Sequence, residues 1–314
     1  MRILAVVVLY KRSLEQSQTL TSLGKAFRGQ PELLEFLRVL VWDNSPTALA
    51  DPALAFPFEY LHSGKNVGNS GAYNRAMELA EATGIPWLLL LDQDTTISEE
   101  FLPKMLEYSR RLADHLEVAA VVPILWCRGQ LISPRRFGIF SRTVAIPRPC
   151  HGSYQGQVVA VDSAAMIRVT ALRAVGGYNE LLFWLDFGDI DVFAAFHRNR
   201  RSIYIASDLQ LQHSLSCMDY DNEMTPERYR NVLAAEGAFW ELYGSHFDHV
   251  VLPLRLLARA LKQYLRNQNK AFARMSWMAF CLRMQRTKAQ RMKTWEEQLR
   301  QRDLPAVQTG KLAD

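Results

Sequence analysis

The chain lacks the cysteine patterns of a zinc-bound or disulfide-bonded fold. Its 314 residues include only four cysteines, Cys127, Cys150, Cys217 and Cys281, which lie far apart and form no CxxC pair. Zinc sites and disulfide frameworks need closely spaced or regularly paired cysteines. We therefore expect isolated thiols in a reducing compartment.

Long apolar runs are also missing, since no stretch approaches the roughly 20 residues that span a bilayer. Residues 3–10 are apolar and follow Arg2, but the stretch is short and no small-residue cleavage site comes after it. We interpret it as a buried strand and expect a cytoplasmic protein.

Acidic residues are absent from 251 to 293, although the net charge of the whole chain is only +5. Residues 251–314 carry 14 basic and 4 acidic residues, whereas residues 1–250 carry 23 and 28. This distribution argues against a uniformly basic nucleic-acid binder, so we expect no nucleic-acid partner. It predicts a mildly acidic body over 1–250 and a basic tail over 251–314.

Short apolar segments alternate with helical patterns along the first half of the chain. We expect strands at residues 3–9, 36–42, 58–61, 87–91 and 118–125. We expect helices opened by a capping box of Ser13 and Gln16, over 72–82, and from Ser98. This alternation predicts an α/β fold with a mostly parallel central sheet flanked by helices.

The second half is less regular. We expect a loop or hairpin over 128–149, strands over 158–167 and 203–212, and helices over 170–175, from about 191 to 199 and over 226–243. Ligands of such sheets bind at the carboxyl ends of the strands. Asp43, Asn66 and the pair Asp92 and Asp94 all follow predicted strand ends.

The segment Asp92-Gln93-Asp94 comes directly after four leucines. Two carboxylates at a buried strand end are costly unless something compensates them, and oxygen ligands of this kind suit Mg²⁺ or Mn²⁺. A solvated turn after a strand is the other interpretation. His213 also ends a predicted strand; it is either a structural histidine or a partner of this pair.

Two further segments carry candidate functional residues. Asp189 and Asp191 lie among large apolar side chains, which suits a general base, although acids also favour the first turn of a helix. Residues 66–75 resemble a phosphate-cradling loop before a helix, or simple loop and cap chemistry. They match neither a Walker A loop nor a GxGxxG fingerprint.

Seven motifs occur in a characteristic order. They are Val6-Val7-Val8-Leu9-Tyr10, Asp43-Asn44-Ser45, the run Asn66, Gly68, Gly71, Ala72, Asn74, then Leu91-Asp92-Gln93-Asp94-Thr95, Gly176-Gly177-Tyr178-Asn179-Glu180, Asp189-Ile190-Asp191 and Gln212-His213. Over residues 3–216 this order resembles the inverting glycosyltransferases of family 2, which have the GT-A fold. The Leu-Asp-Gln-Asp form points to the rhamnosyltransferase-like group of that family.

The resemblance implies roles for individual residues. The implied donor-binding residues are Tyr10, Asp43, Asn66, Gly68, Gly71, Asn74, Asp92 and Ser163. The implied metal ligands are Asp94 and His213, with Asp92 beside them near the ribose and diphosphate. Asp189 matches the general base, and Asp191 matches the acidic position two residues later. The chain departs from the family at Gly188, where a Glu is common, and at Ala195, where an Arg is common.

The activity implied by the resemblance is metal-dependent sugar transfer with inversion. The donor would be a dTDP- or UDP-sugar, with dTDP-rhamnose as one candidate. The acceptor would be a hydroxyl of a saccharide or lipid-linked molecule in bacterial surface-polysaccharide synthesis. Two other classes stay open: a nucleotidyltransferase, and a non-catalytic membrane-associated protein with a degenerate transferase fold.

The basic tail has a helical amphipathic pattern over 251–293. Leu254, Leu257, Leu261, Tyr264 and Leu265 fall on one side of a helical wheel, with Arg255, Arg259, Lys262 and Arg266 opposite. Such a helix suits an anionic membrane surface, which would place the protein at the inner face of the plasma membrane. Alternatively, the apolar side packs on the catalytic domain or on a second subunit of a homo-oligomer.

Overall fold

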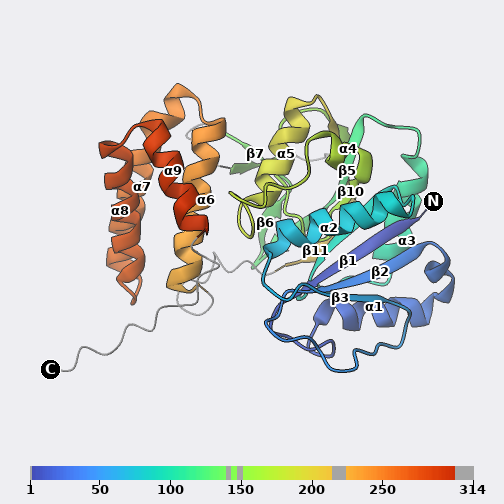
Figure 1. The fold of residues 1–314 in the computed structure, drawn as a ribbon. Helices are drawn as coiled ribbons and strands as arrows, with labels where there is room; N and C mark the ends of the chain where they lie inside the picture. Colours follow the sequence, from blue (N-terminus) through green and yellow to red (C-terminus); the bar gives the residue numbers. More distant parts are fainter. Residues whose placement is uncertain (1, 139–142, 147–150, 214–223, 301–314) are drawn as a thin grey trace. The chain divides into compact units, whose positions relative to one another are not determined.

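The computed structural model describes residues 2–138, 143–146, 151–213 and 224–300. The chain divides into two compact units, Met1–Leu215 and Ser216–Asp314, which are described separately below (Figure 1). The division falls earlier than the boundary after residue 250 that the charge pattern predicts. Cys150 and Cys217 lie outside the described residues, and Cys127 and Cys281 are free thiols.

The first unit is built on a nine-stranded sheet of order β3-β2-β1-β4-β10-β5-β11-β9, with β6 paired to β5. Its strands are β1 (Ile3–Leu9), β2 (Leu37–Asp43), β3 (Glu59–His62), β4 (Trp87–Asp92), β5 (Val118–Cys127), β6 (Gln130–Ser133), β9 (Gly152–Tyr154), β10 (Met166–Arg168) and β11 (Ser202–Gln212). A two-stranded sheet pairs β7 (Arg135–Phe137) with β8 (Thr143–Ala145). The β1–β2, β2–β3, β1–β4 and β5–β11 pairs are parallel, whereas β10 runs antiparallel between β4 and β5.

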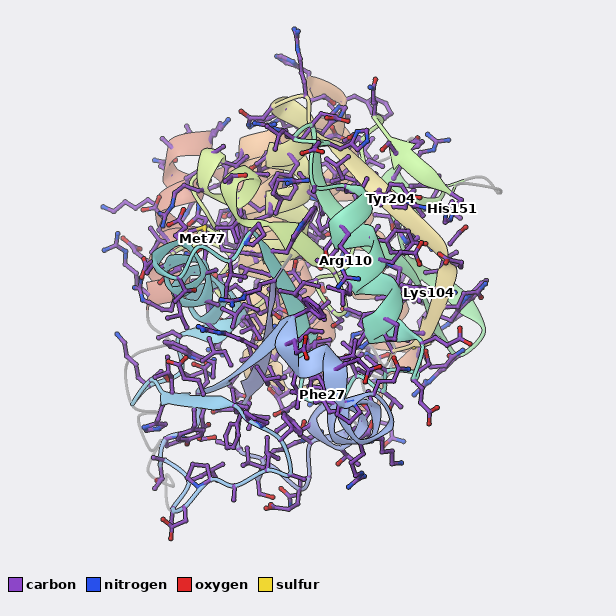
Figure 2. The ribbon with its side chains drawn as sticks, turned by 90° about the vertical axis from the view of Figure 1, so that its right-hand side faces the viewer. Phe27, Met77, Lys104, Arg110, His151 and Tyr204 are labelled. Carbon is purple, nitrogen blue, oxygen red and sulfur yellow. The ribbon has the colours of Figure 1, made fainter. Side chains whose placement is uncertain are left out.

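Helices cover both faces of this sheet. They are α1 (Gln18–Gly29), the 3₁₀ helix η1 (Pro31–Glu35), α2 (Gly68–Ala82), α3 (Phe101–Arg111), α4 (Val169–Ala174) and α5 (Gly188–Arg198). Alternate β1 side chains enter two separate cores, because successive side chains of a strand point to opposite faces. One core holds Phe27 of α1 and the other holds Met77 of α2, both labelled in Figure 2.

All seven residues of β1 are buried, and so are the first five of β4. A strand covered on both faces reads as a continuous apolar run, which is why the sequence pattern located these strands. Each buried aliphatic side chain contributes about 1.5–3 kcal/mol. The predicted mostly parallel α/β arrangement is therefore the one observed.

Three predicted elements differ in the structure. Helix α2 begins at Gly68 rather than at residue 72, so most of the predicted loop over 66–75 is helical. Helix α1 begins after Ser17, whose hydroxyl accepts from the Leu20 amide, rather than at Ser13. The Ser13 amide does bind the Gln16 side chain, but only within a turn before the helix. The predicted strand over 158–167 is reduced to Met166–Arg168 (β10), because a turn interrupts it at Asp162, where Ala164 has a left-handed φ of 64°.

The second unit is helical. Its elements are α6 (Pro226–Tyr243), α7 (His246–Arg266), α8 (Ala271–Gln285) and α9 (Lys288–Arg300). Tyr229, Leu256 and Phe272 belong to its core. Beside this core, the Gln263 amide donates to the Tyr229 hydroxyl, and Ser276 donates to Gln263.

Ion pairs inside the second unit explain why it begins before the predicted boundary. Glu236 of α6 pairs with Arg259 (2.6 Å), and buried Glu241 pairs with Arg283 (3.3 Å) and Arg291 (2.6 Å). The acids that neutralise the basic tail thus lie on α6, N-terminal to residue 251. Helix α6 belongs with the tail because its carboxylates are the partners of these arginines.

Candidate active site

The carboxyl edge of the central sheet brings the predicted polar residues together. In the parallel register, Leu9 at the end of β1 lies opposite Asp43 of β2, and Val8 lies opposite Asp92 of β4. The carboxyl ends of β1, β2 and β4 therefore meet at one edge. This edge is where ligands of α/β sheets bind.

Asp92, Asp94 and His213 form a cluster at this edge. One ligand atom from each side chain lies within 4.8 Å of those of the other two. Asp92 is the last residue of β4, Asp94 lies in the turn after it, and His213 follows β11, where its amide donates to the Trp126 carbonyl (2.9 Å). The fold thus unites three residues that the resemblance names as metal ligands.

The environment of Asp92 is suited to a bound cation. Burial raises the pKa of this carboxyl and Asp94 raises it further, while His213 and a hydrogen bond from Ser163 oppose the increase. Ser163 donates to Asp92 Oδ2, and Tyr73 donates to Oδ1 at 3.5 Å. The carboxylate is therefore oriented by neutral hydroxyls and has no lysine or arginine partner among the described residues.

His213 carries a further indication of a ligand. Its Nε2 lies 3.8 Å from Asp92 Oδ2 and 3.4 Å from Ser163 Oγ. Among the described residues, no group forms a hydrogen bond with its buried Nδ1. Two carboxylates and one imidazole are donors that suit Mn²⁺ or Mg²⁺, so this cluster fits a divalent metal.

Asp189 lies in the first turn of α5, on the same unit. The turn before it is sharp, because Phe187 has a left-handed φ of 68° and Gly188 leaves no room for a side chain between Ser70 and the Phe183 carbonyl. Strained backbone of this kind is typical of functional sites. Burial raises the pKa of Asp189 to about 7, and the negative charges of Asp186 and Asp92 contribute to the increase.

A carboxyl with a pKa of about 7 is well matched to general-base work near neutral pH. Asp191, two residues later in the same turn, is buried, and its amide donates to the Phe187 carbonyl. The structure therefore distinguishes the two acids by environment. Asp189 is the partly buried one, and its proton affinity is tuned by the other carboxylates of the site.

The candidate donor segment 66–74, most of which forms the start of α2, is fixed to the turn that carries Asp189. The Ser70 amide donates to the Trp184 carbonyl (3.1 Å), and the Ser70 hydroxyl donates to the Phe183 carbonyl. Gly68 has a φ of +70°, and a Cβ there would overlap the Trp184 carbonyl oxygen. Only glycine fits this position, where the loop and the 183–184 backbone touch.

Other residues of this segment have structural partners. Asn66 accepts from the Gly68 amide (2.9 Å) as a local cap. Asn74 accepts from the Tyr178 amide and donates to Glu180 (2.7 Å), so it clamps the segment after Gly177 onto α2. Gly71 allows close packing against Val67.

At the other side of the site, Asp43 is fully buried and Tyr10 is exposed. The Asp43 carboxylate accepts from the Tyr60 hydroxyl (2.6 Å) and the Ser45 amide (2.8 Å). The Tyr10 amide donates to Gln93 (3.0 Å), which connects the ends of β1 and β4. Both predicted nucleotide-binding residues thus lie at the carboxyl edge of the sheet. The Asp43 carboxylate is already hydrogen-bonded to protein groups, whereas the Tyr10 side chain is exposed.

Two residues of the site, Asp162 and Asn44, were given no role from the sequence. Asp162 is buried and accepts from the Tyr178 hydroxyl (2.8 Å); burial and the nearby charge of Asp189 raise its pKa well above the usual range. Asn44 accepts from the Trp42 indole (3.0 Å) and donates to the Gly68 carbonyl (3.1 Å). In the sequence, the position of Asp162 directly before Ser163 was the one indication that it could belong to the site.

Comparisons with known proteins agree with this geometry. Residues 5–176, more than half of the chain, match the family described as "Glycosyl transferase family 2". No curated protein matches the chain. The crystal structure of S. aureus TarS 1–349 is similar, with a TM-score of 0.53 and 16% identity over 96% of this chain and 92% of that one.

The structure of the same TarS fragment in complex with UDP-GlcNAc gives a TM-score of 0.52, with 15% identity over 96% and 92% of the two chains. At this identity the likeness concerns the fold. It confirms the predicted GT-A arrangement of a mostly parallel sheet flanked by helices. The predicted rhamnosyltransferase-like group finds no such support.

Proposed function

Because the chain belongs to glycosyltransferase family 2 and is a glycosyltransferase, we propose that it transfers a sugar from a nucleotide-sugar donor to an acceptor hydroxyl with inversion. In this proposal Asp92, Asp94 and His213 hold a divalent metal, Mg²⁺ or Mn²⁺. Asp189 is the general base. The observation that carries the proposal is the cluster of three ligand side chains beside a carboxyl whose pKa is about 7.

The metal would supply positive charge for the diphosphate that leaves in the transition state. The protein prepares this site with Asp92 held by Ser163 and Tyr73, and with His213 Nε2 3.8 Å from Asp92 Oδ2. Tyr10, Asp43 and the segment from Asn66 through Gly68 and Gly71 to Asn74, at the start of α2, would border the nucleotide and sugar.

The acceptor proton would go to Asp189. An ionised carboxylate opposite the leaving group removes the proton from the acceptor hydroxyl as its oxygen attacks the anomeric carbon. The bond from that carbon to the diphosphate breaks as the new glycosidic bond forms, which inverts the configuration. Asp191 and Asp162 would keep the surroundings of this base polar.

Two observations support the choice of donor. TarS 1–349, which has a similar fold, has a structure in complex with UDP-GlcNAc, and this supports a nucleoside diphosphate sugar as donor. The Leu-Asp-Gln-Asp motif favours dTDP-rhamnose as the sugar to test first. The acceptor would be a saccharide or a lipid-linked saccharide of a bacterial surface polysaccharide, and the reaction would then take place at the inner face of the plasma membrane.

A donor screen tests this proposal. The purified chain is incubated with UDP- and dTDP-sugars, with Mn²⁺, Mg²⁺ or EDTA, and donor binding and turnover are measured separately. We expect metal-dependent binding of at least one donor and a product of inverted anomeric configuration by NMR. Absence of binding and turnover under every condition would contradict the proposal.

Three variants separate the roles. Asp94→Ala should lose the metal-dependent part of donor binding. Asp189→Asn should keep donor binding and lose transfer by at least 100-fold, in the range for a general base. Asp114→Asn, which changes an exposed carboxylate after α3, is the matched control and should behave as the parent chain. Transfer retained by Asp189→Asn would reject its role, and nucleotide binding without turnover by the parent chain would favour a non-catalytic binding protein.

A further inference from the structure

One side of α7 is apolar and exposed along nearly its whole length. The exposed side chains are Phe247 (51%), Val250 (67%), Leu254 (62%), Leu257 (39%), Leu261 (60%), Tyr264 (60%) and Leu265 (70%). They recur every three or four residues, so they lie on one side of a helix. At 1.5 Å per residue this stripe is about 27 Å long.

The opposite side of α7 is the one that packs inside the helical unit. Its buried residues are Leu252, Leu256, Ala260 and Gln263. The sequence pattern left open whether the apolar stripe packs on protein. Within this unit the apolar stripe stays exposed, and α7 packs through its smaller buried side instead.

Helix α8 packs beside α7 and adds exposed apolar side chains of its own. They are Trp277 (50%), Met278 (68%) and Met284 (62%). We call the exposed residues of both helices the outer surface of α7 and α8. Monomeric proteins seldom expose so many large apolar side chains together, and such surfaces mark binding sites.

The cations of this region fall into two groups. Arg255, Arg259, Arg283 and Arg291 face Glu236 or Glu241 and are used inside the unit. Lys262, Arg266 and Arg274 are exposed and have no carboxylate within ion-pair distance among the described residues. On their helices, Lys262 lies three residues before exposed Leu265 and Arg274 lies four residues before exposed Met278, so both border the outer surface. Arg266 follows one turn after Lys262, on the polar side of α7.

This distribution of charge selects the partner. Between 246 and 285 the sole acid is Asp248, and it is engaged in the capping box with Ser245. A two-fold contact with a second copy would therefore bring cations toward cations without a carboxylate to separate them. An anionic lipid surface instead offers negative head groups to the cations and an acyl boundary to the leucines, tryptophan and tyrosine.

We propose that the outer surface of α7 and α8 binds the surface of an anionic phospholipid membrane. The stripe lies parallel to the membrane plane, with its leucines in the head-group boundary and Lys262, Arg266 and Arg274 on the phosphates. Among the described residues, no helix meets the length and hydropathy of a transmembrane segment. The proposed contact is with the membrane surface. The inference goes beyond the proposed function and does not depend on it.

Vesicle co-sedimentation tests the proposal with the full chain. The vesicles are phosphatidylcholine alone, or phosphatidylcholine with 30% phosphatidylglycerol. We expect binding to the anionic vesicles only, with weaker binding as salt rises from 50 to 500 mM, because the cations act within a Debye length of the surface. Equal binding to both vesicle types, or none, would overturn the proposal.

Two variants and one control make the test specific. Leu254→Gln combined with Leu261→Gln should weaken binding at least tenfold, and Lys262→Gln combined with Arg266→Gln should weaken it by about five-fold for each cation lost. Leu116→Gln is the matched control, since Leu116 is equally exposed (62%) but lies in the first unit. Circular dichroism and light scattering accompany each measurement.

Three results would contradict the membrane assignment. The leucine variant could bind vesicles as tightly as the parent chain. The Leu116→Gln control could lose binding equally. Light scattering could show a dimer that the leucine variant converts to a monomer while vesicle binding is unchanged, which would assign the surface to a second copy. None of these readouts requires sugar transfer, so the membrane proposal and the proposed function can fail independently of each other.

Discussion

Asp189 is the residue on which pH should act most directly. Its pKa of about 7 means that the carboxylate form, which the proposed proton removal needs, is depleted below neutrality. We expect kcat/KM to fall about tenfold for each pH unit below that value. The measurement is a pH profile of transfer at low donor and acceptor concentration.

The cause of this pKa can be tested through Asp186. The negative charge of Asp186 raises the pKa of Asp189 because two nearby carboxylates disfavour each other's ionisation. Asp186→Asn should therefore move the acidic limb of the profile to lower pH. Asp114→Asn, remote from the site along the chain and exposed, should leave it in place. A limb that moves upward in Asp186→Asn would show that another interaction dominates.

At the scale of single elements, the N-terminus of α2 depends on two glycines that differ in one respect. Gly64 and Gly68 both have left-handed backbone, with φ of +71° and +70°. A Cβ at Gly64 meets nothing within 4 Å, whereas one at Gly68 overlaps the Trp184 carbonyl. The comparison thus separates backbone strain from the close approach of two segments.

Gly64→Ala should cost about 1 kcal/mol of unfolding free energy, the usual cost of a left-handed alanine. Gly68→Ala should cost about 3 kcal/mol or more, because the loop or the 183–184 turn must also move. Chemical denaturation of the full chain gives both values. Equal losses would mean that the Trp184 backbone yields easily, and the proposed rigid connection would then be wrong.

The helices of the second unit are joined by carboxylates of unequal importance. Glu241 is buried between Arg283 and Arg291, whereas Glu297 lies exposed 3.9 Å from Lys293. Glu241→Gln should destabilise the unit by about 3–5 kcal/mol, because it leaves buried Arg283 without its charge partner. Glu297→Gln should change stability by less than about 0.5 kcal/mol. Thermal unfolding followed by circular dichroism measures both, and similar losses in the two variants would contradict this ranking.

At the scale of the whole molecule, the two units should respond differently to ligands. The proposed metal and nucleotide site lies entirely within Met1–Leu215. Ligands that bind only the folded state raise its stability, by about 2.7 kcal/mol at 100 times the dissociation constant. Calorimetry with UDP and Mn²⁺ should therefore raise the unfolding temperature of the first unit alone, and EDTA should reverse the increase. A shift of both transitions would show that the units unfold together.

The strands were predictable because a strand buried on both faces has a continuous run of apolar residues. Strand β1 has the predicted bounds. The cluster of Asp92, Asp94 and His213 was predictable because Asp92 and Asp94 follow one buried strand and His213 follows another. The clamp made by Asn74 was not, because its partners lie over 100 residues away. Neither was the outward direction of the α7 stripe, since an amphipathic pattern is the same whether its apolar side meets protein, lipid or water.

The contact between α2 and the segment before Asp189 has a consequence for altering donor choice. Ser70 binds the carbonyls of Phe183 and Trp184, so these two stretches of backbone are expected to move as one body. A substitution in the loop that tilts α2 to admit another sugar would also tilt the turn that presents the carboxylate. A change in donor range would then be accompanied by a change in the pH dependence of transfer. Selection for a different donor would therefore be expected to shift the pH optimum as well.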